Sequence, residues 1–299
     1  MRRLAFLILA VPLAAQSHPD LQGFWNSATA TPLERSAQFK NKEFLTPKEA
    51  ADLERRAEAQ HEEPTLNSAR GFVTYNALFR ESGTKVVRSL RTSIVIDPPD
   101  GRIPALKPAA AAAKRLRDER LKNPNGVKDF GLQDRCIDFK MGPPPMLPYA
   151  YNSNYQILQT NDKVLINVEM AHDNRVIHLD RQTHLPAVTQ LWLGDSIGRW
   201  EGATLVVDTA NFHEGGGYYG DAGGMYAWDR NLHVVERFSM PDADAILYRF
   251  EVEDPTVLTR GWKGEYTISR IAGPVFEYAC QEGNYALPNL LNIFKMGKQ

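Results

Sequence analysis

The sequence predicts a mainly β fold in which an antiparallel meander closes into a barrel, with two surface helices in the N-terminal third. Three observations lead to this prediction. After residue 154, short segments of alternating apolar and polar side chains follow one another, separated by turn residues. Together with shorter segments upstream they number about ten, which is enough to close a barrel. No internal repeat of about 20–50 residues and no dinucleotide or phosphate-loop pattern competes with this interpretation.

The meander is expected to consist mainly of hairpins. Turn residues such as Asn-Asp and Glu-Gly-Ala separate its segments, as is typical of antiparallel neighbours. The expected elements are two strands in 154–170, a third strand in 171–180, a hairpin in 199–209 that turns at 201–203, and a hairpin in 232–255 that turns at 241–244.

Residues 17–153 are expected to pack on the barrel, so that they form one compact domain with the meander core of residues 154–299. Thr46, Pro47 and Glu49 form a capping box with proline at the first helical position, which predicts a helix to about His61. An alanine-rich, charged segment predicts the second surface helix at 108–122. Between the helices, residues 91–108 predict a strand, a Pro-Asp-Gly turn and another strand.

The chain begins with the features of a cleaved signal peptide, residues 1–16. Arg2 and Arg3 give a positive start, residues 4–13 are apolar, and small residues follow where cleavage is expected. The apolar run is too short to cross about 30 Å of hydrocarbon as a helix. The sequence therefore predicts an exported protein, periplasmic or extracellular, without a membrane span.

The charge of the chain is nearly balanced, with 35 basic and 36 acidic residues. No run of five or more like charges occurs. This argues against nucleic acid or an anionic membrane as a partner and leaves a small-molecule ligand or substrate as the expected partner. No cofactor motif is evident.

The two cysteines, Cys136 and Cys280, predict one disulfide, because an even pair in an exported protein is normally oxidised. Two free thiols are the alternative. The disulfide would anchor residues 123–153, a segment rich in Pro, Gly and Asn that predicts a loop, to the end of the meander.

Five motifs together resemble a large family of exported, mostly uncharacterised bacterial proteins, over nearly the whole mature chain. They are DLQGFW (20–25), WLGDSIGRWEGATLVVDTANF (192–212), LHVVERF (232–238), LYRFEVEDP (247–255) and FEYACQEGNY (276–285). Such proteins also resemble lipocalin-like barrels, which implies a Gly-x-Trp strand before the meander. The resemblance implies no catalytic residues. The chain departs from the family pattern at Ala203, where aspartate is usual, and in the glycine-rich segment after Phe212.

Two polar groups in the meander are candidates for acid–base chemistry. Alternation places Glu236 on the same face as Val234 and Phe238, so its carboxyl is expected inside the barrel, where burial favours a general acid or base. A buried Glu–Arg pair is the alternative. His172 and Asp173 follow a strand, and an imidazole oriented by a carboxylate suits a general base. An ordinary Asp-Asn turn is the alternative there.

A ligand site is expected from aromatic side chains and one cation. Arg175 is the candidate for binding an acidic group, and Trp192 and Trp200 are candidates for the walls of a cavity. Residues 213–231 combine six glycines with aromatic rings, as expected of a lid over a ligand. The candidate lid residues are Tyr218, Tyr219 and Trp228.

Metal binding and nucleophilic catalysis are not predicted. His172, His178 and His184 are evenly spaced, with His213 and His233 later, but no pair has the spacing that places two ligands on one face of one element. No Gly-x-Ser-x-Gly motif occurs.

Three functions remain open from the sequence. The first is an exported barrel that binds a small apolar or ring-shaped molecule under the lid. The second is a lyase, isomerase or hydrolase on the same barrel that uses His172, Asp173 and Glu236. The third is a structural protein of the cell envelope, which is expected if side chains fill the barrel.

Overall fold

The computed structural model describes residues 18–62, 66–67, 72–73, 83–137, 139, 142–149, 151–214 and 229–296. The predicted signal peptide, residues 1–16, lies outside these ranges. So do Tyr218, Tyr219 and Trp228 of the predicted lid.

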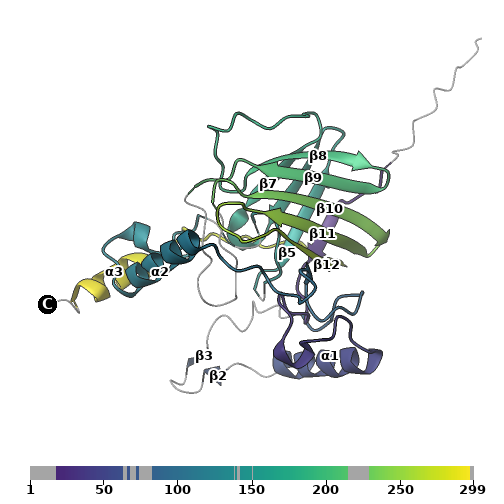
Figure 1. Cartoon of the computed structure of the whole chain (residues 1–299), viewed down its shortest axis with the longest axis horizontal. Coiled ribbons are helices and arrows are strands. Elements are labelled where there is room, and N and C mark those ends of the chain that lie inside the picture. Colours follow the sequence, from purple (N-terminus) through teal and green to yellow (C-terminus); the bar gives the residue numbers. More distant parts are fainter. Residues whose placement is uncertain are drawn as a thin grey trace, which may run out of the picture.

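The described chain forms a closed, nine-stranded β-barrel with helices outside it (Figure 1). The strand order is β1-β5-β6-β7-β8-β9-β10-β11-β12, and the end of β12 pairs back with β1; β4 pairs with the start of β12, on the edge opposite to β11. The prediction of a mainly β, lipocalin-like barrel is therefore confirmed. The barrel strands are β1 (Gly23–Asn26), β5 (Asn154–Gln159), β6 (Lys163–Val168), β7 (Asn174–His178), β8 (Asp195–Glu201), β9 (Thr204–Ala210), β10 (His233–Asp242), β11 (Ala245–Glu253) and β12 (Trp262–Ile271); the additional strand is β4 (Val95–Asp97).

Shorter elements complete the fold. Helix α1 includes the expected capping box, in which the Glu49 carboxylate accepts from the Thr46 backbone N–H at 2.7 Å. The sequence analysis did not predict the C-terminal helix α3. The remaining elements are α1 (Pro47–Glu62), α2 (Pro108–Lys122), α3 (Ala286–Met296), the 3₁₀ turns η1 (Ala37–Phe39), η3 (Val127–Asp129) and η4 (Met170–His172), and a separate pair of strands β2 (Leu66–Asn67) and β3 (Phe72–Val73). No helix among the described residues combines the length and apolar character needed to cross a bilayer.

One seam of the barrel is parallel, so the expectation of a purely antiparallel meander is wrong there. Strands β7 and β8 pair in parallel at Ile177↔Ser196 and His178↔Ile197. Residues 179–194 return the chain to the end at which β7 begins, as a parallel neighbour requires. The predicted hairpin in 91–108 also forms only in part, because Leu106 makes a single bridge with Leu258 instead of a strand beside β4.

Aromatic side chains fill the barrel interior. Side chains alternate along β11, where Ile246, Tyr248, Phe250 and Val252 face the core and are each 1% exposed or less. The Tyr248 ring lies edge-on to Tyr266 at 5.3 Å, and Phe250 lies edge-on to Trp262 at 5.2 Å. The core aromatic residues on the barrel strands are Trp25, Tyr155, Phe238, Tyr248, Phe250, Trp262 and Tyr266.

Residues 142–149, the proline-rich loop, reach into this core. Met146 and Leu147 are each 1% exposed. The backbone N–H of Met146 donates to the Tyr248 hydroxyl at 3.0 Å, and the Tyr266 hydroxyl donates to the Met146 carbonyl at 2.7 Å. The predicted Cys136–Cys280 disulfide is confirmed and anchors the start of this region to the segment after β12.

Candidate functional site

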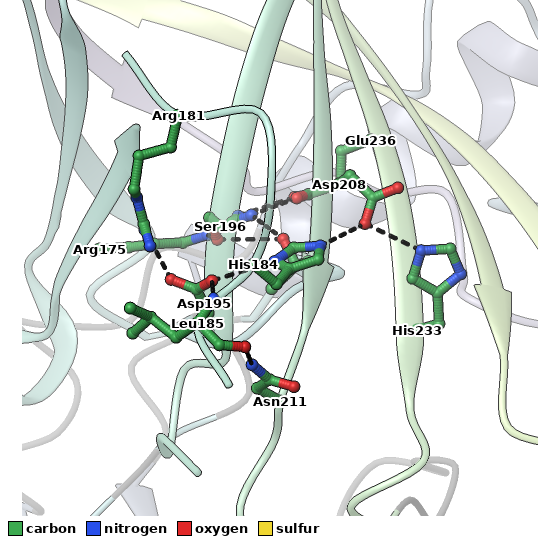
Figure 2. Close-up of polar contacts among 11 residues, drawn as sticks. Arg175, Arg181, His184, Leu185, Asp195, Ser196, Asp208, Asn211, His233 and Glu236 are labelled. Carbon is green, nitrogen blue, oxygen red and sulfur yellow. Dashed lines mark hydrogen bonds and ion pairs between the residues drawn. The ribbon is translucent and has the colours of Figure 1, made fainter. Parts of the chain in front are cut away.

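A buried ion pair crosses the barrel interior between β7 and β10 (Figure 2). Arg175 and Glu236 are 1% and 0% exposed in their side chains and pair through both carboxylate oxygens. The Arg175 guanidinium also donates to the hydroxyls of Ser196 at 3.0 Å and Thr209 at 2.9 Å, and Tyr248 donates to Glu236 at 2.7 Å. Every partner of the pair is thus inside the protein.

This pair decides between two interpretations left open by the sequence. Glu236 does face inward as its alternation predicts, but it lies in the buried Glu–Arg pair and has no solvent contact. Arg175, the expected anchor for an acidic ligand, is the other half of that pair. Both side chains stabilise the barrel interior, where neither can meet a ligand without the core opening.

A chain of histidines and aspartates lies on the outer face of the neighbouring strands (Figure 2). Asp208 on β9 points outward, opposite to the inward-facing Thr209. Its Oδ1 lies 2.9 Å from Nε2 of His184 and 2.9 Å from Nε2 of His233, the first residue of β10. The hydrogen bond with His233, followed by that with His184, lowers the pKa of Asp208 to about 2. The same bond raises the pKa of His233.

The chain continues from His184 to Asp195 at the start of β8. Nδ1 of His184 lies 3.0 Å from Asp195, which also accepts from the backbone N–H of Leu185 at 2.9 Å and from Arg181 at 2.7 Å. Burial alone would raise the pKa of Asp195, but these donors lower it overall. His184, Leu185 and Arg181 all belong to the connection 179–194. The cluster therefore fixes this connection on the outside of β8 and β9.

A pocket of about 690 Å³ lies where the short pairing of β7 and β8 ends. Leu179 and Arg181, which follow β7, form one wall, and Gly198 and Trp200 of β8 form another. The last residue of β5, Gln159, also lines the pocket. The Trp200 indole packs partly on the core, and the His18 ring stacks on it with 4.7 Å between centroids and 3° between planes. The volume is in the range of small-molecule sites.

The two tryptophans expected to line one cavity lie at opposite ends of β8. Trp192 precedes the strand and stacks on His213 at 4.0 Å. Trp200 lies near its other end, roughly 17 Å along the strand from Asp195 at about 3.3 Å per residue. The predicted lid starts at His213, so its described start lies beside Trp192 and away from the Trp200 pocket.

His172 and Asp173 lie where β6 ends. Ala171 and His172 have φ of 61° and 58°, so η4 breaks the alternation and leaves His172 exposed. Its Nδ1 lies 2.8 Å from the carbonyl oxygen of Tyr278, while Glu236 belongs to the separate ion pair. Asp173 Oδ2 is buried and has no hydrogen-bond partner among the described residues. Burial raises the pKa of Asp173 to about 7, against a smaller opposing effect of His172.

Sequence reasoning missed the His184–Asp208–His233 cluster and Arg181. The signal available was the alternation in β9, which places Asp208 outward, and the register that sets it opposite Val235 beside His233. Nothing in the sequence indicates that His184 joins them. In the described ranges, no group of three or more His, Cys, Asp or Glu side chains has the arrangement needed to hold a metal ion.

Comparison of the chain with family models, with curated proteins and with solved structures finds no match.

Proposed function

We propose that this protein is an exported barrel that binds a small, ring-shaped molecule in the pocket at the β7–β8 seam, with Trp200 as the surface on which the ring stacks. The disulfide supports export, because such bonds persist in oxidising compartments. The filled interior supports a site in the barrel wall over one in the lumen.

The His18–Trp200 stack is the observation that carries this proposal. A planar ring already lies parallel to the indole, so the exposed face of Trp200 accepts flat groups. Polar side chains around it, including Arg181 and Gln182, supply directional hydrogen bonds. An apolar platform with a few polar groups is the usual composition of a small-molecule site.

Binding of a panel of ring compounds to the mature protein tests the proposal. We would titrate indole, benzoate, naphthalene-2-carboxylate, naphthalene-2-carboxamide and glucose by calorimetry, after native mass spectrometry for any ligand retained from the periplasm. At least one compound should bind to the wild type and to Trp192→Leu, but at least tenfold more weakly to Trp200→Leu. The Trp192 variant is the matched control, since it also removes a stacked indole.

Circular dichroism should show that both variants keep the barrel. If no compound binds, or if both variants bind equally well, the pocket is not a ligand site. The structural role in the envelope then becomes the better interpretation, as the filled interior would suggest.

A second candidate function is acid–base catalysis at Asp173. A buried carboxyl with a pKa of about 7 is suited to exchange protons near neutral pH, and the left-handed residues beside it are typical of functional sites. The ring nitrogen of His172 that faces away from Tyr278 is the available base. An activity that survives in Glu236→Gln but is lost in Asp173→Asn would support this candidate, and the reverse pattern would exclude it.

A further inference from the structure

The charged side chains described in the lining of the pocket at the β7–β8 seam are basic. Among the described residues that line it, two are arginines, Arg181 and Arg199, and none is acidic. Arg199 is paired with Glu201 at 2.6 Å, but both side chains are at least half exposed. Such surface pairs contribute little, so a ligand anion can replace Glu201 at small cost.

Arg181 is the better anchor because its position is fixed. One of its terminal nitrogens donates to Asp195, whose side chain is 3% exposed and is held in turn by His184 and the Leu185 backbone. Its side chain lines the pocket and is 25% exposed, so a terminal nitrogen that does not bind Asp195 can donate to a ligand. A guanidinium that is already oriented and has unused donor capacity suits a planar oxyanion such as a carboxylate.

The stacking of the His18 ring on Trp200, at the other side of the pocket, indicates a flat ligand. His18 lies within 3° of parallel on Trp200, and its hydrogen bond to the Gly202 carbonyl, at 3.2 Å, is exposed to solvent. The backbone that follows is held separately, since the Gln159 side chain bonds both Leu21 N–H at 3.1 Å and the Pro19 carbonyl at 3.4 Å. Displacement of the His18 side chain by a ligand would therefore leave residues 19–21 in place.

We propose that the ligand is a planar aromatic acid whose ring takes the place of His18 on Trp200 and whose carboxylate binds Arg181. This inference rests on the proposed function, because it names the ligand class of the same pocket. Asp195 and His184 act as positioning residues that hold Arg181 toward the ligand. The outer histidine–aspartate cluster would then have a second role, because it holds Arg181 in addition to fixing the connection 179–194.

Two probes that share one ring, one charged and one neutral, separate the contribution of the charge to the affinity from that of the ring. Naphthalene-2-carboxylate and naphthalene-2-carboxamide should both bind through Trp200, and the acid should bind at least about tenfold more tightly at pH 7, as expected for a charge-assisted hydrogen bond. Arg181→Gln should remove this preference and leave the affinity for the amide unchanged. Arg260→Gln, which removes an exposed arginine paired with Asp97, is the control and should change neither affinity.

Two further variants keep the test decisive if Arg181→Gln disturbs the Asp195 cluster. Arg181→Lys keeps the charge beside Asp195 but loses the planar fork, so it should lower the acid preference in part. His18→Ala should tighten both probes about two- to tenfold, because it removes a competing ring.

The outcomes distinguish the ligand class from the existence of the site. If the acid and the amide bind equally and both need Trp200, the aromatic-acid inference is wrong and the proposed function stands. If His18→Ala weakens binding, His18 belongs to the site and the ring does not replace it. If neither probe binds and no other compound of the panel does, the proposed function fails as well.

Discussion

At the scale of single residues, the clearest case is the Arg175–Glu236 pair. Alternation along β10 indicates that Glu236 faces the core, and its burial is complete. A carboxylate in that environment needs a hydrogen-bonded cation, which Arg175 supplies from β7, 61 residues earlier. The pair thus connects two strands that are not neighbours in the barrel.

We expect Glu236→Gln to lower the free energy of unfolding by about 3–5 kcal/mol, because it leaves the Arg175 charge buried without a counter-ion. Urea unfolding measures the loss. Glu251→Gln on the adjacent strand is the matched control; Glu251 pairs with Arg237 and Lys263 but is 39% exposed, so its loss should be below about 1 kcal/mol. Equal losses in the two variants would contradict the assigned role of the buried pair.

At the scale of elements, the connection 179–194 decides the shape of the site. It must cross the outside of the barrel to make β8 parallel to β7, and residues 181, 184 and 185 fix it there through Asp195 and Asp208. The same crossing leaves β7 and β8 paired over a short length, which creates the pocket beside Trp200. One connection therefore accounts for both the seam and the orientation of Arg181.

The His184–Asp208–His233 cluster should make the free energy of unfolding fall both at acid pH and at alkaline pH. Asp208 has a pKa lowered to about 2, against about 3.9 when unfolded, so its contribution is present above about pH 4 and is lost as the pH falls toward 2. His233 has a raised pKa, so its contribution is full below about pH 6.5 and is lost as the pH rises through the folded value. The contribution of this cluster should therefore be largest between roughly pH 4 and 6.5.

Unfolding free energies from pH 2.5 to 8.5 test this dependence. Asp208→Asn should reduce the change of the free energy of unfolding with pH both in the acid range and in the neutral-to-alkaline range. Asp242→Asn is the control: the exposed Arg88 lowers the pKa of Asp242 and no histidine takes part, so that variant should keep the wild-type change above pH 6. An unchanged profile of Asp208→Asn above pH 6 would rule out the His233 contribution.

At the scale of the whole molecule, distant parts of the chain close the fold. The early strand β1 inserts between β5 and β12 and completes the barrel. The disulfide joins residues 144 positions apart, outside the barrel, and holds the region before the proline-rich loop against the segment after β12.

We expect replacement of both cysteines by serine to lower the free energy of unfolding by about 4–5 kcal/mol, the chain-entropy value for a loop of this length. Reductant should produce the same loss in the wild type and none in the double variant, because the chain has two cysteines in all. Thermal and urea unfolding measure both. A loss in the double variant that reductant cannot reproduce would indicate an effect of the serines and not of the bond.

The sequence by itself determined most strands of the barrel, their turns and the face that side chains within those strands occupy. The hairpin between β8 and β9 turns at residues 202–203 and that between β10 and β11 at 243–244, close to the predicted positions. The reason is that alternation has a period of two and is a local property of the chain. Where that period stops, as at Ala171 and His172, alternation no longer indicates the face of a side chain.

Only the tertiary structure decided which side chains meet. Pairing of Arg175 with Glu236, and of His184 with Asp195 and Asp208, depends on which strands become neighbours. At the β7–β8 seam, the connection 179–194 sets which strands pair, and its sequence has no periodic pattern of apolar side chains. The pocket and the cation beside it arise from this connection, because side chains far apart in sequence come together only once the barrel closes.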